Sequence, residues 1–245
     1  SSLPTHLITN QFSSVTGIKF NEQYARGDYH ELNRTFVSTS GFLLFILFPI
    51  SGIMFLFSKE IVSILLERGA FGEKGVSETA LFLKYLGFLA PLLAINTLFS
   101  RLFMAAHKII ESFWYQIFFN LGLILTLYFA VKGFGVVGYP MTVVSLYTLN
   151  VIVSYFLEKR YFNIIDYKKI LTSFSKVIIL NICVIIGMLL VKMWLGNYWV
   201  SDFLMLGFGT VIYGSVVLVL GYKFCIDETF SSFVGRYWSK IFRRW

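Results

Sequence analysis

The feature that most constrains this chain is a set of long stretches without any charged residue. A stretch of about 18 or more apolar residues is long enough to cross the roughly 30 Å hydrocarbon core of a bilayer. Four uncharged stretches cover residues 36–57, 112–131, 133–157 and 203–222. Two more contain only lysines among the charged residue types, namely 79–100 with Lys84 and 170–192 with Lys176 and Lys192. The sequence therefore predicts six full membrane-spanning helices.

The composition agrees with lipid as the surrounding solvent. Of the 245 residues, 57% are hydrophobic and 14% are charged, whereas a soluble domain has about half apolar and about a quarter charged residues. We therefore expect an all-α polytopic membrane protein. Residues 1–17 are mostly apolar, too short to cross comfortably, and begin with Ser rather than Met. We expect them to be the end of a truncated span, in the C-terminal part of a larger protein.

The positions of the basic residues predict the orientation. When residues 18–35 are placed in the cytoplasm, the loops on that side carry fourteen Lys and Arg residues. The opposite loops carry four, which are Lys59, Arg68, Lys74 and Lys132. Cytoplasmic loops carry an excess of Lys and Arg in membrane proteins, so we expect a multi-pass protein with a cytoplasmic C-terminus. The net charge of +8 then indicates membrane orientation, and not binding to nucleic acid.

We divide the chain into a main group of spans at 18–160, two terminal spans at 161–222, and a tail at 223–245. In the tail, aromatic and aliphatic residues recur at steps of three and four, with basic residues between them. The members singled out are Arg236, Trp238, Lys240, Arg243, Arg244 and Trp245. This pattern is typical of a basic amphipathic helix that lies on an anionic inner leaflet. A site for a partner protein is the alternative.

Polar residues inside the apolar stretches are the candidates for a substrate path. Four successive stretches carry one asparagine each, namely Asn96, Asn120, Asn150 and Asn181. An amide in hydrocarbon is costly without a partner, so each should face another helix or a wet cavity. Lys84 and Arg101 are further candidates, because cations in a membrane usually mark a polar path. The alternatives are bonds between helices for the amides and snorkelling to the headgroups for the two cations.

Proline and glycine mark bends. Pro49 lies in the middle of the first full stretch and predicts a kink there. Asp28 is expected to cap that helix, with Glu31 in the capping-box position. The sequence GFGVVG, with Gly133, Gly135 and Gly138, has the letters of a dinucleotide-binding motif, but that motif requires a preceding strand in a soluble βαβ unit. We interpret it as a tight turn between two helices.

The loop after residue 57 predicts a short helix on the outer interface, because Ile61, Ile64 and Leu65 recur at helical spacing. Gly69 is expected to stop this helix, and Ser77 to cap the next span. The alternative is a binding loop in which Arg68 meets a phosphate.

No catalytic or metal-binding constellation is visible in the sequence. Cys183 and Cys225 share no motif spacing, and the three histidines are far apart. We find no phosphate-binding loop and no paired carboxylates within a span. We therefore expect neither an enzyme nor a cofactor.

Motifs in the loop after residue 57 and in the stretch that follows it carry a resemblance to a known family. Arg68, Gly69, Ala70 and Phe71 form an Arg-Gly-x-Phe segment after an apolar stretch, and Thr79, Ala80 and Leu83 open the next stretch. Arg101, Phe103 and Ala105 end that stretch in an arginine–aromatic–alanine pattern. In these residues the chain resembles the MurJ (MviN) lipid II flippase family, a branch of the multidrug, oligosaccharidyl-lipid and polysaccharide exporter superfamily.

The resemblance implies the C-terminal lobe of a two-lobe, fourteen-span flippase fold in the bacterial inner membrane. It implies alternating access that moves an undecaprenyl-pyrophosphate-linked cell-wall precursor, lipid II, with an N-terminal lobe as the partner of this chain. Three alternatives remain open at this point. They are a flippase for O-antigen or capsular repeats, a multidrug antiporter of the same fold, and a membrane scaffold that transports nothing.

Overall fold

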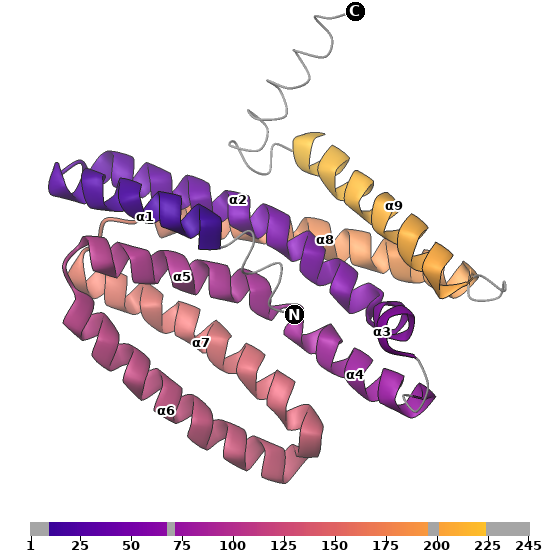
Figure 1. Cartoon of the computed structure of the whole chain (residues 1–245). Coiled ribbons are helices and arrows are strands. Elements are labelled where there is room, and N and C mark those ends of the chain that lie inside the picture. Colours follow the sequence, from indigo (N-terminus) through magenta and orange to yellow (C-terminus); the bar gives the residue numbers. More distant parts are fainter. Residues whose placement is uncertain (1–9, 68–71, 196–200, 224–245) are drawn as a thin grey trace, which may run out of the picture. The chain divides into compact units, whose positions relative to one another are not determined.

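The computed structural model describes residues 10–67, 72–195 and 201–223, and these residues form helices and no strand. The helices are α1 (Asn10–Ala25), α2 (Tyr29–Leu56), α3 (Ser58–Leu66), α4 (Glu73–Leu86), α5 (Leu89–Ala105), α6 (Ile109–Phe134), the 3₁₀ turn η2 (Gly135–Val137), α7 (Gly138–Tyr161), α8 (Tyr167–Leu195) and α9 (Asp202–Lys223). Figure 1 shows their course along the chain.

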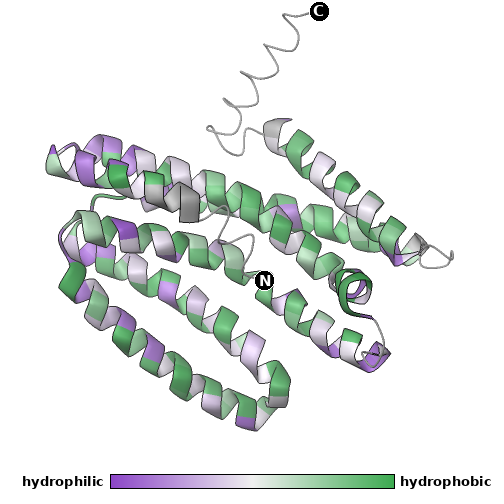
Figure 2. Cartoon of the chain, in the orientation of Figure 1, coloured by the Kyte–Doolittle hydropathy of each residue, from purple (hydrophilic) through white to green (hydrophobic). Residues whose placement is uncertain are grey.

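Five stretches of the described residues are long and apolar enough to cross a membrane. They are Tyr29–Leu56, Glu73–Ala105, Ile109–Tyr161, Tyr167–Met193 and Asp202–Gly221. The third contains both α6 and α7, which are the two helices predicted at 112–131 and 133–157. Colouring by hydropathy shows the hydrophobic residues running along the bodies of these helices (Figure 2). The all-α polytopic architecture predicted from the uncharged stretches is thus confirmed.

The chain divides into two compact units. Unit 1 comprises residues 1–40 and 81–166, and unit 2 comprises residues 41–80 and 167–245. In unit 1, α1 packs against α5, and α5 packs against both α6 and α7, which pack along each other. The ring of Phe36, in the first part of α2, lies 5.9 Å from that of Phe20 in α1 and 5.3 Å from that of Phe99 in α5, measured between centroids. These rings form the aromatic core of unit 1.

In unit 2, the second part of α2 joins α3, α8 and α9 around a buried cluster that includes Phe45, Phe57, Val184 and Tyr213. Glycines let rings approach the helix backbones here. A side chain at Gly52 would overlap the Tyr213 ring and hydroxyl, and one at Gly209 would overlap the Phe57 ring. Small residues serve the same purpose at helix interfaces in membranes generally, where close packing holds the helices together.

Local signals in the sequence explain most helix ends. The Oδ1 atom of Asp28 accepts a 3.1 Å hydrogen bond from the Glu31 backbone N–H, which confirms the predicted cap of α2. The Glu31 side chain does not complete the capping box, because it bonds to Arg34 at 3.3 Å. Pro49 lies inside α2. The predicted short helix after residue 57 is confirmed as α3, which ends at Leu66, whereas Gly69 lies outside the described residues.

GFGVVG forms a turn between helices, as predicted, and Gly135 adopts the left-handed backbone region at φ +65°. Gly138 starts α7 where a side chain would overlap the Ala130 carbonyl of α6, so the two helices meet closely there. Gly133 is the second-last residue of α6, and a side chain would meet nothing within 4 Å.

The span predicted at 79–100 is present within Glu73–Ala105, but its start and its regularity differ from the prediction. Ser77 does not cap a helix, because α4 begins at Glu73, an acidic residue in the first turn where the helix dipole favours it. Within this span the helix is interrupted at Gly87 and Phe88, which separate α4 from α5. Pro91 explains the break, since its ring excludes a regular helical bond to the carbonyl of Gly87, four residues earlier.

Candidate functional site

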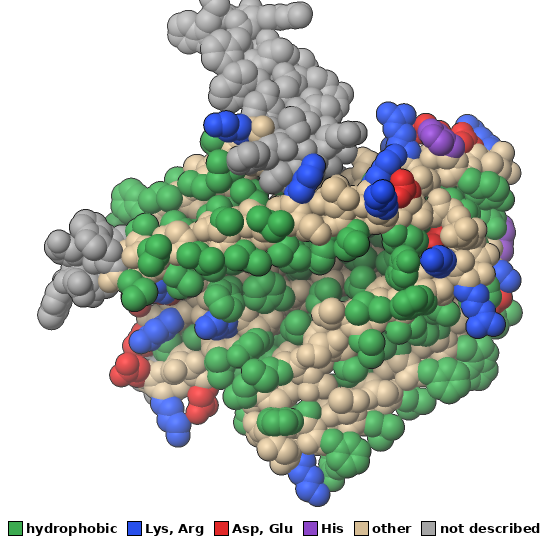
Figure 3. All heavy atoms as spheres, turned by 180° about the vertical axis from the view of Figure 1, so that it is seen from behind, with side chains coloured by type: hydrophobic (Ala, Val, Ile, Leu, Met, Phe, Trp, Pro, Cys, Tyr) green, Lys and Arg blue, Asp and Glu red, His purple; other side chains and the backbone are tan. Residues whose placement is uncertain are grey.

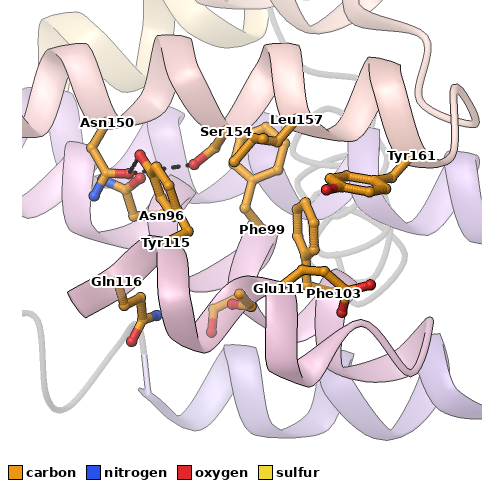
Figure 4. A pocket seen from close by; sticks show the side chains of 12 residues that line it. Asn96, Phe99, Phe103, Glu111, Tyr115, Gln116, Asn150, Ser154, Leu157 and Tyr161 are labelled. Carbon is orange, nitrogen blue, oxygen red and sulfur yellow. Dashed lines mark hydrogen bonds between the residues drawn. The ribbon is translucent and has the colours of Figure 1, made fainter. Parts of the chain in front are cut away.

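Unit 1 contains a polar pocket of about 90 Å³ between α5, α6 and α7. Most of the lining residues carry an amide, hydroxyl or carboxylate group, and four of the lining residues carry an aromatic ring. These residues are Asn96, Ser100, Glu111, Ser112, Tyr115, Gln116, Asn150, Ser154 and Tyr161, with Phe99, Phe103 and Leu157 completing the wall. Figure 4 shows these side chains, with Asn96, Tyr115, Asn150 and Ser154 close together. The pocket therefore brings together polar groups from helices that are otherwise apolar.

One side of the pocket is a small hydrogen-bond network between α6 and α7. The Tyr115 hydroxyl donates a 2.7 Å bond to Oδ1 of Asn150, and the Ser154 hydroxyl donates a longer bond of 3.4 Å to the same oxygen (Figure 4). Ser154 lies one helical turn after Asn150 on the same face of α7. Asn150 thus has a partner on another helix, which was one of the two roles expected for it.

Asn96 lies on α5 and has no such partner. Both its Nδ2 and its Oδ1 atoms are buried, and neither finds a hydrogen-bond partner among the described residues. A buried amide without partners costs about 1–3 kcal/mol per group in proteins. Asn96 and Asn150 are the two asparagines that line the pocket.

At one end of the pocket, Glu111 lies beside Lys108, which precedes α6. The Lys108 ammonium donates a 2.9 Å hydrogen bond to Oε1 of Glu111 and lies 5.7 Å from the centroid of the Tyr161 ring. The hydrogen bond to Glu111 raises the pKa of Lys108 above its ordinary value. This pair therefore keeps both charges at physiological pH, and each charge is balanced by the other.

The structure distributes the other predicted site residues among different environments. The stem of Arg101 lies against Gly17 of α1, with its Cδ atom 3.2 Å from the position that a Cβ there would take. Lys84 is half-buried in the last turn of α4. Neither residue lines the polar pocket.

Asn120 is exposed on α6. The motif Arg68, Gly69, Ala70 and Phe71 and the tail from Arg236 to Trp245 lie outside the described residues.

Asn181 has a structural environment in unit 2. Its Oδ1 atom accepts a 2.8 Å bond from the hydroxyl of Tyr213 in α9, and its Nδ2 atom donates a 2.8 Å bond to the carbonyl oxygen of Val177. Asn181 is 4% exposed, so both ends of the amide are satisfied within the packed helices. This is the interhelical bond that was the alternative to a place on a substrate path.

Two buried acidic residues were not singled out in the sequence. Glu60 of α3 is 6% exposed and pairs with Lys192 of α8 at 2.5 Å. Glu158 of α7 is fully buried, and its Oε1 atom accepts bonds of 2.9 and 3.1 Å from the N–H groups of Ile164 and Ile165. The sequence places Glu60 just after an apolar stretch and Glu158 just after another, which resembles the pattern of solvated loop residues. Only the contacts of the folded chain show that both are buried.

On the face in Figure 3, hydrophobic side chains are spread over the described surface, whereas the charged side chains gather in small groups. Among the described residues, no group of three or more His, Cys, Asp or Glu side chains is placed to hold a metal ion.

Comparisons with known proteins agree with this architecture. The family described as lipid II flippase MurJ matches residues 1–209. A solved structure described as lipid II flippase MurJ in an inward closed conformation superposes with a TM-score of 0.72 at 21% sequence identity. The superposition covers 91% of this chain and 44% of that one, so this chain spans less than half of the solved protein. No curated protein sequence matched the chain. Because the family match extends over most of its length, the chain belongs to the MurJ lipid II flippase family.

Proposed function

We propose that this chain is the C-terminal lobe of a flippase that moves lipid II, an undecaprenyl-pyrophosphate-linked cell-wall precursor, from the inner to the outer leaflet of the bacterial cytoplasmic membrane. The observation that carries this proposal is the family match over residues 1–209. The fold supports it, because the superposition extends over 91% of this chain. Transport is expected to proceed by alternating access together with the N-terminal lobe.

The physical reason for such a protein is the headgroup of its substrate. A pyrophosphate and its sugars cannot cross roughly 30 Å of hydrocarbon unaided, whereas the lipid tail can remain in the bilayer. A transporter provides a polar path at the interface between its repeats and exposes it to each side in turn. We propose Lys84, Arg101, Asn96 and Asn150 as contributors from this lobe, and Arg68 as a phosphate contact at the outer mouth.

The proposed topology places the C-terminus in the cytoplasm. The bias of fourteen basic residues against four supports it. The tail at 223–245 would then lie on the anionic inner leaflet through Arg236, Lys240, Arg243 and Arg244. A cysteine introduced at residue 240 should react with a membrane-impermeant thiol reagent only after the inner face is opened, and reaction in intact cells would contradict the orientation.

The function is tested by depleting the full-length protein in the bacterium that makes it and measuring lipid II in each leaflet. We expect lipid II to accumulate in the inner leaflet and to disappear from the outer one. Continued arrival of lipid II at the outer leaflet would refute the proposal. Loss of O-antigen or capsule with normal lipid II translocation would instead assign the protein to the export of other lipid-linked sugars.

A further inference from the structure

The polar pocket of unit 1 contains an unusual amide. The side chain of Asn96 lies on α5, within a stretch apolar enough to cross a membrane. Its donor and acceptor atoms are both buried without a partner among the described residues. Inside a bilayer there is no bulk water to satisfy such groups. The free-energy cost of this arrangement indicates that the folded protein places a hydrogen-bonding group against Asn96.

The pocket has room for that group. A buried water needs about 10–15 Å³ of cavity measured with a water-sized probe, and two to four polar partners. The pocket measures about 90 Å³, which is several times this requirement. Ser100, Ser112 and Gln116 add hydroxyl and amide groups to the lining, besides Asn96 and the network around Asn150. The pocket is therefore polar enough and large enough to hold a water molecule or another hydrogen-bonding group.

The charges of the lining also restrict which chemical group can bind in the pocket. Among the described residues, Glu111 is the only Asp, Glu, Lys or Arg of the pocket lining, and the Lys108 ammonium balances its charge at 2.9 Å. A bare ammonium or phosphate would lose its hydration there without gaining an unbalanced counter-charge, which is strongly unfavourable. An amide presents one donor end and one acceptor end, so a neutral group that both donates and accepts fits Asn96. A hydroxyl group has this property.

We propose that Asn96 and its neighbours form a binding site for a neutral hydroxyl group inside unit 1. Water carries such a group, and so do the sugars of the proposed lipid-linked substrate. Binding of a substrate sugar rests on the proposed function, whereas binding of water does not. The site would hold a hydroxyl group between otherwise apolar helices, next to the aromatic rings of Phe99, Phe103 and Tyr115.

Radiolytic hydroxyl-radical footprinting tests the site, because side chains beside bound water are oxidised faster than other buried side chains. The experiment uses the full-length protein in lipid nanodiscs. We expect Tyr115, which is half-buried, to be oxidised faster than Tyr213, which is fully buried in unit 2 and gives the background rate. Asn96→Leu, which replaces the amide by an apolar group of similar size, should slow the oxidation of Tyr115 several-fold. Asn120→Leu is the matched control, since Asn120 is exposed on α6.

Equal oxidation of Tyr115 and Tyr213 in the unmodified protein would overturn the proposal. So would a rate at Tyr115 that Asn96→Leu leaves unchanged. Ser100→Val, at the next turn of α5 in the same pocket, is a second variant in case Asn96→Leu does not fold, and it should also slow the oxidation of Tyr115.

Adding lipid II to the same samples distinguishes the two sources of the hydroxyl. A substrate hydroxyl that displaces water should slow the oxidation of Tyr115 in the unmodified protein and leave the Asn96→Leu variant unchanged. An unaltered rate would exclude the substrate sugar and leave water as the occupant. Failure of lipid II flipping in the leaflet assay would refute the proposed function, and the fast oxidation of Tyr115 would still report the site.

Discussion

The ammonium group of Lys192 lies 2.5 Å from Oε1 of Glu60 and donates a 2.9 Å hydrogen bond to the carbonyl oxygen of Leu56. Leu56 is the last residue of α2, where carbonyl oxygens lack partners within the helix. Lys192 also lies 5.5 Å from the centroid of the Phe57 ring. One side chain near the end of α8 therefore joins the end of α2 to the first turn of α3.

Removing this cation should destabilise unit 2. Lys192→Met leaves the carboxylate of Glu60 buried without its counter-charge, and we expect a loss of about 3 kcal/mol in the free energy of unfolding. This is the lower end of the usual range, because the Lys192 side chain is 30% exposed. The measurement is unfolding by SDS titration, followed by circular dichroism.

Lys176→Met is the matched control, because Lys176 is exposed on the same helix. Adding Glu60→Gln to Lys192→Met should restore part of the stability, since the buried charge is then gone. Equal stability of the two lysine variants would show that the ion pair contributes nothing.

A side chain at position 52 should destabilise unit 2, because Gly52 lies against the Tyr213 hydroxyl. Gly52→Ala should lower the free energy of unfolding by about 1–3 kcal/mol, because the new methyl group overlaps the Tyr213 ring and hydroxyl. In the Tyr213→Phe background the same change should cost less, since the atom nearest to the methyl group is absent. A double-mutant cycle from unfolding curves gives this coupling. Gly214→Ala, where a side chain meets nothing within 4 Å, is the control, and strict additivity would contradict the contact.

Glu158 should hold the segment between α7 and α8. Glu158→Ala leaves the N–H groups of Ile164 and Ile165 without their acceptor, at a cost of about 1–3 kcal/mol. We expect faster hydrogen exchange at these two amides, measured by mass spectrometry. Glu158→Gln retains an acceptor oxygen and should exchange at a rate between those of the parent and the Ala variant. Unchanged exchange in Glu158→Ala would show that other contacts hold the segment.

The turn between α6 and α7 should require glycine at Gly135 but not at Gly133. Gly135→Ala should cost about 1–2 kcal/mol, because a side chain is strained at φ +65° and ψ −154°. Gly133→Ala lies within α6 and should instead raise the free energy of unfolding by about 0.5–1 kcal/mol, since alanine is the better helix former. Thermal unfolding of the two variants gives opposite shifts in Tm under this prediction. Shifts in the same direction would contradict it.

The sequence predicted those features that depend on neighbouring residues. Apolar stretches are recognised by their length, so the helices around residues 36–57, 112–131 and 133–157 were expected. The cap at Asp28 and the turn at Gly135 also depend on a few adjacent residues. The break between α4 and α5 was missed although it is local, because the length of the apolar stretch at 79–100 was given more weight than the combination of Gly87 and Pro91.

The roles of the four asparagines show what a linear pattern leaves open. All four lie inside apolar stretches, yet Asn96 and Asn150 line one pocket, Asn181 bonds to Tyr213, and Asn120 is exposed. Their roles depend on how each helix is rotated about its axis and on which helix lies opposite. Both are set by the packing of distant segments.

By itself, the sequence determined that this chain forms apolar helices in a bilayer, since its uncharged stretches are long enough to cross as helices, and a helix satisfies its backbone N–H and C=O groups within the stretch. It also determined the family, through motifs that are local in the chain. Only the tertiary structure decided which polar groups meet. Glu60 and Lys192 are far apart along the chain, and their pairing, like the convergence of Asn96 and Asn150, exists because packed helices bring together side chains that no local pattern relates.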